Sequence, residues 1–457
     1  MDKFFKISAL SAAIMGAAVA APAIAQDPVG PEYSGAVSEF FPESTISGNL
    51  NFWMRARDRE DKPGGTMKTN LDHGSIFANL GFNSGYVGGV AGLDAVIYST
   101  FDMWQNGGAD HEMNFWGVNN PYDKEAKDSG CADVWTDCTD NGVSFTTAAA
   151  KFKFGESGTA KLGYFQPSVP SSLGVNWSFA PGSYLGGEVG GKVAGVDLGL
   201  VVATEYKAPW FKSTYDFQTT NGEDAGTLYS VGARYTLDNG ISLDAAYGGL
   251  SDGDRWNAHF KVKGTTEGGL YWSPQLYIVD DSEQYDSTAF QLALLTGWSS
   301  GQYSYRAEAT YTGADSGDTS TVGNMAYRLT SQYGGSNGAY EIWWNNRSDF
   351  NHDEELAVFG SVSRDFSDIG GKGFSAGVSA AYGFGSSTPG YDDLAEYAYS
   401  LFANYAIQAG ALKDANISFH YTNYYNDTDA GNWAPYTNLF QDEEDFKLAL
   451  TIPFSVK

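Results

Sequence analysis

Three arginines stand at every second position in the stretch LNFWMRARDRED, near the start of the chain. Side chains of an extended strand point alternately to its two faces, so Arg55, Arg57 and Arg59 would form one row on one face. A guanidinium is always charged and carries five N–H donors, so such a row could hold hydroxyl, amide or carboxylate oxygens of a solute. The alternative is a structural role, in which the arginines pair with acids of the same wall, such as Asp94 and Asp102.

Aromatic side chains form a second group that suits solute binding, because an aromatic face stacks well on the apolar face of a sugar ring. Trp53 and Trp104 share the parity of the polar residues, and Trp177 and Phe179 lie among the prolines of 167–183. A rigid aromatic loop of this kind suits a constriction for a bulky uncharged solute. The alternatives are a membrane-interface anchor for any one tryptophan and an ordinary extracellular loop for 167–183.

Strands must position these residues, because polarity along the chain alternates with a period of two. Segments such as 46–57, 76–83 and 303–311 place apolar residues on one parity and small or polar residues on the other. No comparable stretch has the apolar spacing of an amphipathic helix. The polar parity carries charges of both signs, which a water-filled channel tolerates and a dry interior does not. The candidate pore-lining and solute-binding residues are Trp53, Arg55, Arg57, Arg59, Asp102, Trp104, Lys151, Lys153, Trp177, Phe179, Arg306 and Glu308.

Short and long connections alternate between these segments. The predicted short turns are 83–85, 238–240, 299–301 and 369–371. The predicted long connections are 59–71, 105–142, 167–183, 208–226, 386–395 and 425–443. Short periplasmic turns and long extracellular loops are typical of outer-membrane barrels. The sequence therefore predicts an all-β fold, a closed transmembrane antiparallel β-barrel of 16 to 20 strands. About twenty segments alternate, and the weakest pair is 322–333 and 338–349.

The first 25 residues have the charged start, apolar run and A-x-A cleavage site of a secretory signal peptide. We therefore expect residues 1–25 to be removed and residues 26–457 to form a single barrel domain. Aromatic residues make up 15% of the chain, with 56 Gly and only 14 Pro, which suits many strands joined by tight turns. The net charge of −28 argues against a nucleic-acid partner, because no basic patch meets phosphates.

Signals for other chemistry are weak. Cys131 and Cys138, the only cysteines, suggest a disulfide that closes a short surface loop, with two free thiols as the alternative. The histidines lack metal-ligand spacing, so we expect no metal site, although the acidic stretch 427–429 could hold Ca²⁺ loosely. The match of 373–377 to G-x-S-x-G lies inside an alternating segment and not at a strand–turn–helix elbow. We therefore expect no enzyme activity and no cofactor.

Several longer stretches resemble a known family. FWMRARDRED followed by KTNLDHGS, then KLGYFQPS, TEYKAPW, EIWWNNRSDFN and NLFQDEEDFKLAL are similar to stretches of the chitoporins, which belong to the OprD-type substrate-specific porins of Gram-negative outer membranes. The resemblance covers nearly the whole mature chain. It implies a monomeric barrel of eighteen strands, because it reads 322–350 as a loop region at the mouth. It also implies that 167–183 folds inward, that Arg55, Arg57 and Arg59 form a basic row in the lumen, and that the solutes are chitooligosaccharides.

We therefore expect an outer-membrane channel that takes up oligosaccharides passively, surrounded by outer-membrane lipid and lipopolysaccharide. Two alternatives stay open: an OprD-type porin for small charged solutes, such as basic amino acids or carboxylates, and a barrel enzyme. One departure from the family's pattern is the end of the chain. Such barrels commonly finish on an aromatic residue that serves in assembly, whereas this chain ends FSVK and its last aromatic residue is Phe454.

Overall fold

The computed structural model describes residues 40–59, 71–107, 142–175, 181–208, 214–317, 321–330, 339–388, 391–427 and 442–456. The predicted signal peptide and the residues Cys131, Cys138, Trp177 and Phe179 lie outside these ranges. For Arg59 and Asp102 only the backbone is described. Within the described residues, the one helical element is the short 3-10 helix η3 (Ser367–Ile369), and no helix is long and apolar enough to cross a membrane.

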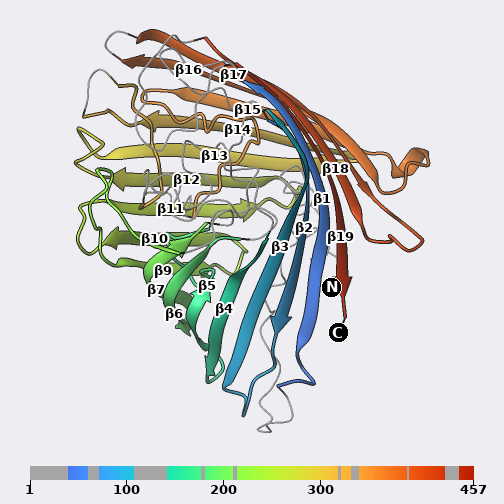
Figure 1. Cartoon of the computed structure of the whole chain (residues 1–457). Helices are drawn as coiled ribbons and strands as arrows, with labels where there is room; N and C mark the ends of the chain where they lie inside the picture. Colours follow the sequence, from blue (N-terminus) through green and yellow to red (C-terminus); the bar gives the residue numbers. More distant parts are fainter. Residues whose placement is uncertain are drawn as a thin grey trace.

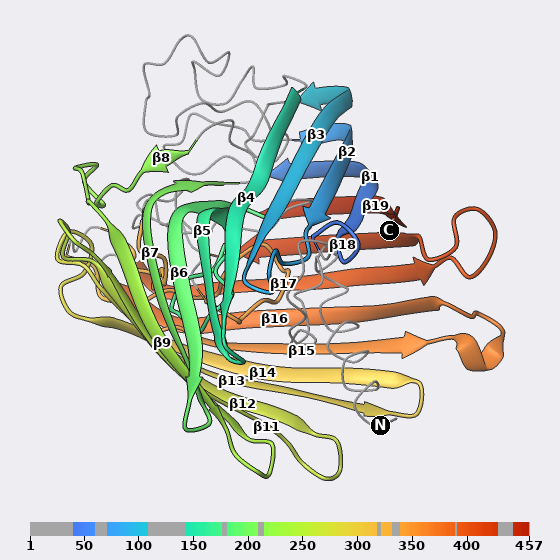
Figure 2. The same ribbon diagram turned by 90° about the horizontal axis from the view of Figure 1, so that it is seen from below.

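In the described part of the chain, eighteen antiparallel strands close into one barrel, which confirms the fold that the alternating polarity predicts. The barrel closes where the first strand, β1 (Thr45–Arg59), pairs with the last, β19 (Glu443–Ser455), and Figures 1 and 2 show these two strands side by side. β8 (Tyr215–Asp216) pairs two residues within the connection after β7 and is not a wall strand. The other wall strands are β2 (Leu71–Asn83), β3 (Ala91–Gly107), β4 (Gly142–Phe154), β5 (Gly158–Phe165), β6 (Ser183–Val193), β7 (Val196–Lys207), β9 (Leu228–Thr236), β10 (Ser242–Leu250), β11 (Trp256–Thr265), β12 (Tyr271–Asp280), β13 (Ala289–Ser300), β14 (Tyr303–Gly313), β15 (Leu356–Asp365), β16 (Phe374–Thr388), β17 (Tyr391–Ala406) and β18 (Asn416–Asn426).

Short connections gather at one end of the barrel and most long ones at the other, as the sequence predicts. One predicted long connection is wrong: β16 continues to Thr388 and β17 begins at Tyr391, so most of 386–395 belongs to these two strands. The alternation of polarity simply extends further along this hairpin than the glycines and serines near its tip suggest. Ser375, the central residue of the G-x-S-x-G match, lies within β16.

The apolar parity of the strands faces outward and the polar parity faces the barrel interior. In β1, Met54 is exposed, whereas its neighbour Arg55 is only 3% exposed. In β13, Leu292 and Leu294 are both exposed, whereas Gln291 beside them is fully buried. Lipid offers the backbone no hydrogen-bond partner, so a sheet within the membrane must close on itself to satisfy every N–H and C=O. The outer apolar side chains then lie in lipid while charges point to the interior.

Two long connections fold into the barrel and cover parts of its inner wall. The first follows β5, and its residues 166–175 lie over glycines of the barrel wall. Gly190, Gly199 and Gly232 sit opposite one another on β6, β7 and β9. A Cβ added at Gly199 would come within 2.3 Å of the backbone oxygen of Pro170. Glycine is therefore required here because the loop backbone approaches the wall too closely for any side chain.

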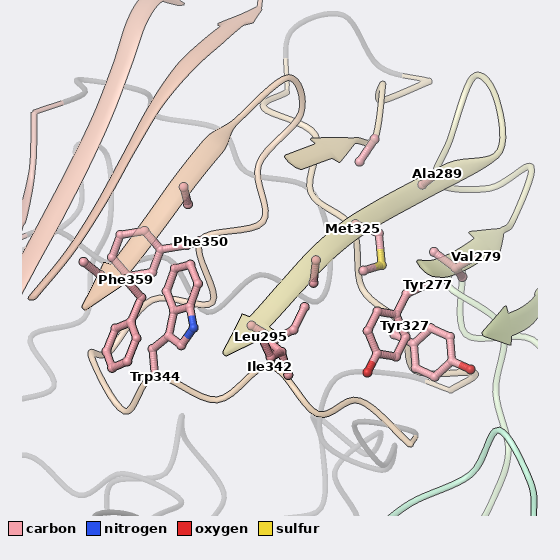
Figure 3. Close-up of a cluster of buried hydrophobic side chains, with 14 of the residues drawn as sticks. Tyr277, Val279, Ala289, Leu295, Met325, Tyr327, Ile342, Trp344, Phe350 and Phe359 are labelled. Atoms are coloured by element: carbon pink, nitrogen blue, oxygen red, sulfur yellow. The ribbon is translucent and has the colours of Figure 1, made fainter. Parts of the chain in front are cut away.

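The second connection joins β14 to β15 and fills more of the interior, where Figure 2 shows its orange trace inside the ring of strands. Arg255 fixes its first part, because Nε donates to the backbone oxygen of Arg328 at 2.6 Å and Nη2 donates to that of Ala326 at 2.7 Å. Further on, the ring of Trp344 stacks on Phe359 of β15 with ring centroids 5.3 Å apart. Figure 3 shows this apolar cluster, which packs the connection against the wall.

Candidate functional site

The arginine row of β1 lies on the inner face, beside the last strand. Arg55 and Arg57 are each 3% exposed. Arg55 makes a bidentate ion pair with Asp445 of β19, in which Nε donates to Oδ1 at 2.7 Å and Nη2 donates to Oδ2 at 3.0 Å. Lys447 Nζ lies 3.1 Å from the same carboxylate. An acid of the wall therefore anchors Arg55, as the structural alternative proposes, and that acid is Asp445.

Of the two acids that the sequence suggested as partners for this row, Asp94 is wrong, and the side chain of Asp102 lies outside the described part of the structure. Asp94 lies opposite Asn83, which pairs with the first residue of β1, at the far end of the strand from Arg55. Its partner is Lys151, whose Nζ lies 2.9 Å from Asp94 Oδ1. Lys153 Nζ lies 4.0 Å from the centroid of the Tyr86 ring. These two predicted lysines therefore lie near the short-turn end of the barrel.

The two tryptophans predicted for the lumen have different positions. Trp53 is on the inner face and 7% exposed. Trp104 is on the outer face and 38% exposed, so its prediction as a lumen residue is wrong. A β-bulge at Met103 adds one residue to β3 and inverts the alternation. Trp104 consequently lies opposite Gly74, which in turn lies opposite the outward-facing Met54.

A second group of charges binds residues 339–355, here called the inner segment, to the wall. Lys261 Nζ and Lys263 Nζ of β11 lie 3.1 and 2.6 Å from Glu341 Oε1. Arg306 of β14 donates from Nη2 to the backbone oxygen of Trp343 at 3.1 Å. β11 and β14 carry these side chains near their short-turn ends. The inner segment therefore runs from the mouth deep into the barrel. The expectation that 322–350 forms a loop region and not two strands is confirmed for its described residues. Its expected position at the mouth is wrong for the part around Glu341 and Trp343.

The remaining predicted pair, Arg306 and Glu308, supports this segment. The carboxylate of Glu308 accepts from Arg306 Nε at 2.7 Å and from Trp344 Nε1 at 2.8 Å. Burial alone would raise the pKa of Glu341, but Lys261 and Lys263 outweigh it and hold that pKa below its ordinary value of 4.5. Ionised Glu341 thus stays paired at neutral pH.

The inner segment then returns to the mouth through a strained backbone. Asn345, Arg347, Phe350 and Glu354 all have positive φ angles, of 56°, 79°, 50° and 58°. Each such residue costs on the order of 1–3 kcal/mol and persists only where its surroundings fix it. Arg347 is fixed by an ion pair with Glu443 of β19 and lies 3.7 Å from Asp445. Phe350 is fully buried, and the centroid of its ring lies 5.4 Å from that of Trp344. The wall therefore holds this segment in one conformation.

Two consecutive tryptophans of the inner segment have opposite environments. Trp344 is 5% exposed and packs against the wall. Trp343 is 52% exposed, although its backbone is held deep inside the barrel by Arg306. Its indole therefore faces the lumen, and an indole face in water can stack on a solute.

Several site residues were absent from the candidates chosen on the sequence. They are Lys261, Lys263, Glu341, Trp343, Arg347, Glu443, Asp445 and Lys447. The alternating polarity of β19 indicates that its charged residues face the interior, because Asp445 and Lys447 alternate with Phe446 and Leu448. In the described part of the chain one group has metal-ligating atoms within 4.8 Å of one another, and it consists of His352, Glu355 and Glu396.

A closed barrel with an apolar outer face, a charged inner wall and a segment folded into its interior defines an outer-membrane channel of the porin class. The model of the outer membrane porin family OprD matches residues 38–456, and the chain belongs to this family. It is 35% identical over 449 residues to the chitoporin of Escherichia coli (strain K12), a match that covers 91% of this chain and 92% of that protein.

Solved structures with the same fold are more distant in sequence. Pseudomonas aeruginosa OpdK with vanillate is 18% identical with a TM-score of 0.70, and the match covers 91% of this chain and all of OpdK. Acinetobacter baumannii OccAB1 is 16% identical with a TM-score of 0.72, and the match covers 93% of this chain and all of OccAB1. The protein is therefore an outer-membrane porin and not an enzyme.

Proposed function

We propose that this porin takes up oligosaccharides passively and that its solutes are chitooligosaccharides. The observation that carries the proposal is the half-exposed indole of Trp343 inside the barrel. Sugar rings have an apolar face that stacks on an aromatic ring, whereas their edges carry hydroxyl and acetamido groups that need hydrogen bonds. An indole fixed by its backbone and by its buried neighbour Trp344 loses little freedom when a sugar stacks on it.

The charges around the lumen suit a neutral polar solute. Arg55, Arg347 and Lys447 lie against the carboxylates of Asp445 and Glu443, and Arg306 lies against Glu308. The three carboxylates balance most of the charge of these four cations, and the remaining N–H groups of the cations can donate to sugar oxygens. Several weak contacts of this kind let a solute enter and leave without being trapped.

The 35% identity with the E. coli chitoporin supports the same solute class. Because one chain closes a complete barrel around its own inner segment, we also propose that each chain conducts as a monomer. The second candidate is a porin for small aromatic or aliphatic carboxylates. It is favoured by the cations of β1 and β19 around Asp445, and by the similarity in fold to OpdK, whose structure was solved with vanillate.

Liposome swelling separates the two candidates. Purified protein is reconstituted into dextran-loaded liposomes, which are diluted into isotonic chitotriose, maltotriose or sodium vanillate. Swelling that is several-fold faster in chitotriose than in maltotriose of the same ring number supports the proposal. Equal rates for the two sugars, or swelling in vanillate alone, would refute it.

A further inference from the structure

The inner segment ends at the mouth in a buried cluster that the solute pathway does not use. His352 and Glu355 lie just before β15, and Glu396 lies on β17. His352 Nδ1 is 3.0 Å from Glu355 Oε2 and 3.2 Å from Glu396 Oε1. All three residues are at most 3% exposed. One imidazole thus faces two carboxylates from two different parts of the fold.

We propose that His352, Glu355 and Glu396 bind a divalent metal ion of the Zn²⁺ type, which fastens the end of the inner segment to the barrel wall. Imidazole nitrogen with carboxylate oxygen is a donor set that suits Zn²⁺, and three protein ligands leave one position for a further donor. Two buried carboxylates so close together repel each other. A divalent ion with a neutral imidazole balances their charge, whereas a single proton on the imidazole does not.

The wall is shaped to hold these carboxylates. Glu355 lies over Gly383 of β16, where a Cβ would come within 1.8 Å of Glu355 Oε1. Gly383 is the residue directly opposite Glu396 in the sheet, so the missing side chain brings the two carboxylates together. A side chain at position 383 would displace Glu355, so glycine there leaves the space in which the Glu355 carboxylate lies beside that of Glu396.

Two buried polar groups at the cluster have unused hydrogen-bonding capacity within the described residues. Tyr424 donates to Glu396 Oε2 at 2.7 Å, whereas Glu396 Oε1 accepts no hydrogen bond of good geometry and has only the contact with His352 Nδ1 at 3.2 Å. Asn324 pairs with His352 in an isolated antiparallel bridge, so the two side chains leave the backbone on the same side. Asn324 is fully buried, and neither its Oδ1 nor its Nδ2 has a hydrogen-bond partner. A metal ion would take up Glu396 Oε1, and Asn324 Oδ1 is the candidate for the fourth position.

The contacts around the imidazole leave one carboxylate without a full partner. Glu355 Oε2 and Glu396 Oε1 both face the same ring nitrogen, His352 Nδ1, which can donate to only one of them. An ion that binds there would also hold the strained return at Glu354, and so keep the inner segment in place.

Metal content and thermal unfolding test the proposal on the whole protein in detergent. The protein is treated with EDTA and then dialysed against micromolar Zn²⁺ in the presence of excess Ca²⁺, which occupies surface carboxylates. The number of Zn²⁺ ions bound per chain is then measured by elemental mass spectrometry. Glu396→Gln and His352→Gln remove ligands, and Glu188→Gln removes an inner-wall carboxylate that is equally buried but distant from the cluster. We expect wild type and Glu188→Gln to retain one Zn²⁺ more than the other two variants, and Zn²⁺ to raise the Tm of the former pair only.

Co²⁺ provides a readout that does not depend on the folding of any variant. In wild type, Co²⁺ at a four-coordinate site of this kind should give visible absorption bands that one equivalent of Zn²⁺ abolishes. Equal Zn²⁺ in wild type and both ligand variants, or no Zn²⁺-sensitive Co²⁺ band in wild type, would overturn the proposal. The cluster would then be a hydrogen-bonded latch that holds a proton.

Discussion

Removing the indole of Trp343 is the most informative perturbation of the lumen. Trp343 is half exposed inside the barrel, and its backbone position depends on Arg306 and not on its own ring. Trp343→Ala should therefore leave the inner segment in place while removing the stacking surface. The expected result is weaker binding of chitohexaose to an otherwise normal channel.

The magnitude follows from the part of the ring that a sugar can cover. Aromatic stacking contributes about 1 kcal/mol beyond area burial. One face of the exposed half of an indole adds up to about 1 kcal/mol at ~25 cal/mol per Å². The variant should therefore lose about 1–2 kcal/mol, which is about a 5- to 30-fold rise in Kd.

Single-channel recording measures this directly, from the rate and duration of chitohexaose blockades. Most of the change should appear as shorter blockades, because a lost contact mainly raises the dissociation rate. Trp104→Ala is the matched control, since Trp104 exposes a similar indole on the outer face. If Trp343→Ala binds chitohexaose as tightly as wild type, or if Trp104→Ala weakens binding equally, the stacking argument is wrong.

Three further predictions concern how the interior is held together. Gly199→Ala would place a Cβ 2.3 Å from the backbone oxygen of Pro170, so it should displace the 166–175 loop and raise the single-channel conductance. Gly360→Ala is the control, because a Cβ there meets nothing within 4 Å. Equal conductance of the two variants would count against the requirement for glycine at position 199. Asp445→Asn removes the carboxylate that binds Arg55 in a buried site and should lower the free energy of unfolding by about 3–5 kcal/mol, measured by urea titration. Asp58→Asn, on the outward face of the same wall, is the control. A loss of stability no larger than that of the control would contradict the anchoring role of Asp445. Because Glu341 has a lowered pKa in the folded protein, its ion pairs should stabilise the inner segment above pH 4.5, and this stabilisation should be lost as the pH falls further. Glu341→Gln should therefore reduce the fall in Tm at acid pH. If the variant loses Tm at acid pH as steeply as wild type, Glu341 is not the source of the pH dependence.

The alternation of polarity was enough to predict the barrel and the direction of its first strand. A residue's face depends only on the parity of its position, so Arg55 and Arg57 could be assigned to the interior from their apolar neighbours alone. The same rule failed at Trp104, because a bulge at Met103 adds one residue without any mark in the sequence. Parity therefore predicts faces only between bulges.

Contacts across the barrel closure could not be predicted in the same way. Arg55 and Asp445 are 390 positions apart, and their pairing depends on the register between the first and last strands. Asp94, one of the two acids proposed from the sequence, is closer along the chain but lies at the other end of the wall. The course of the inner segment was equally hidden, because its anchors on β11 and β14 become neighbours only when the barrel forms.

Single-channel blockade of the wild-type protein tests the central claim most directly. Chitohexaose and maltohexaose have the same number of rings and no charge, so they differ only in linkage and in acetamido groups. The account predicts that micromolar chitohexaose blocks the channel in resolved events and that maltohexaose at the same concentration does not. Equal blockade by both sugars, or blockade by neither, would contradict it.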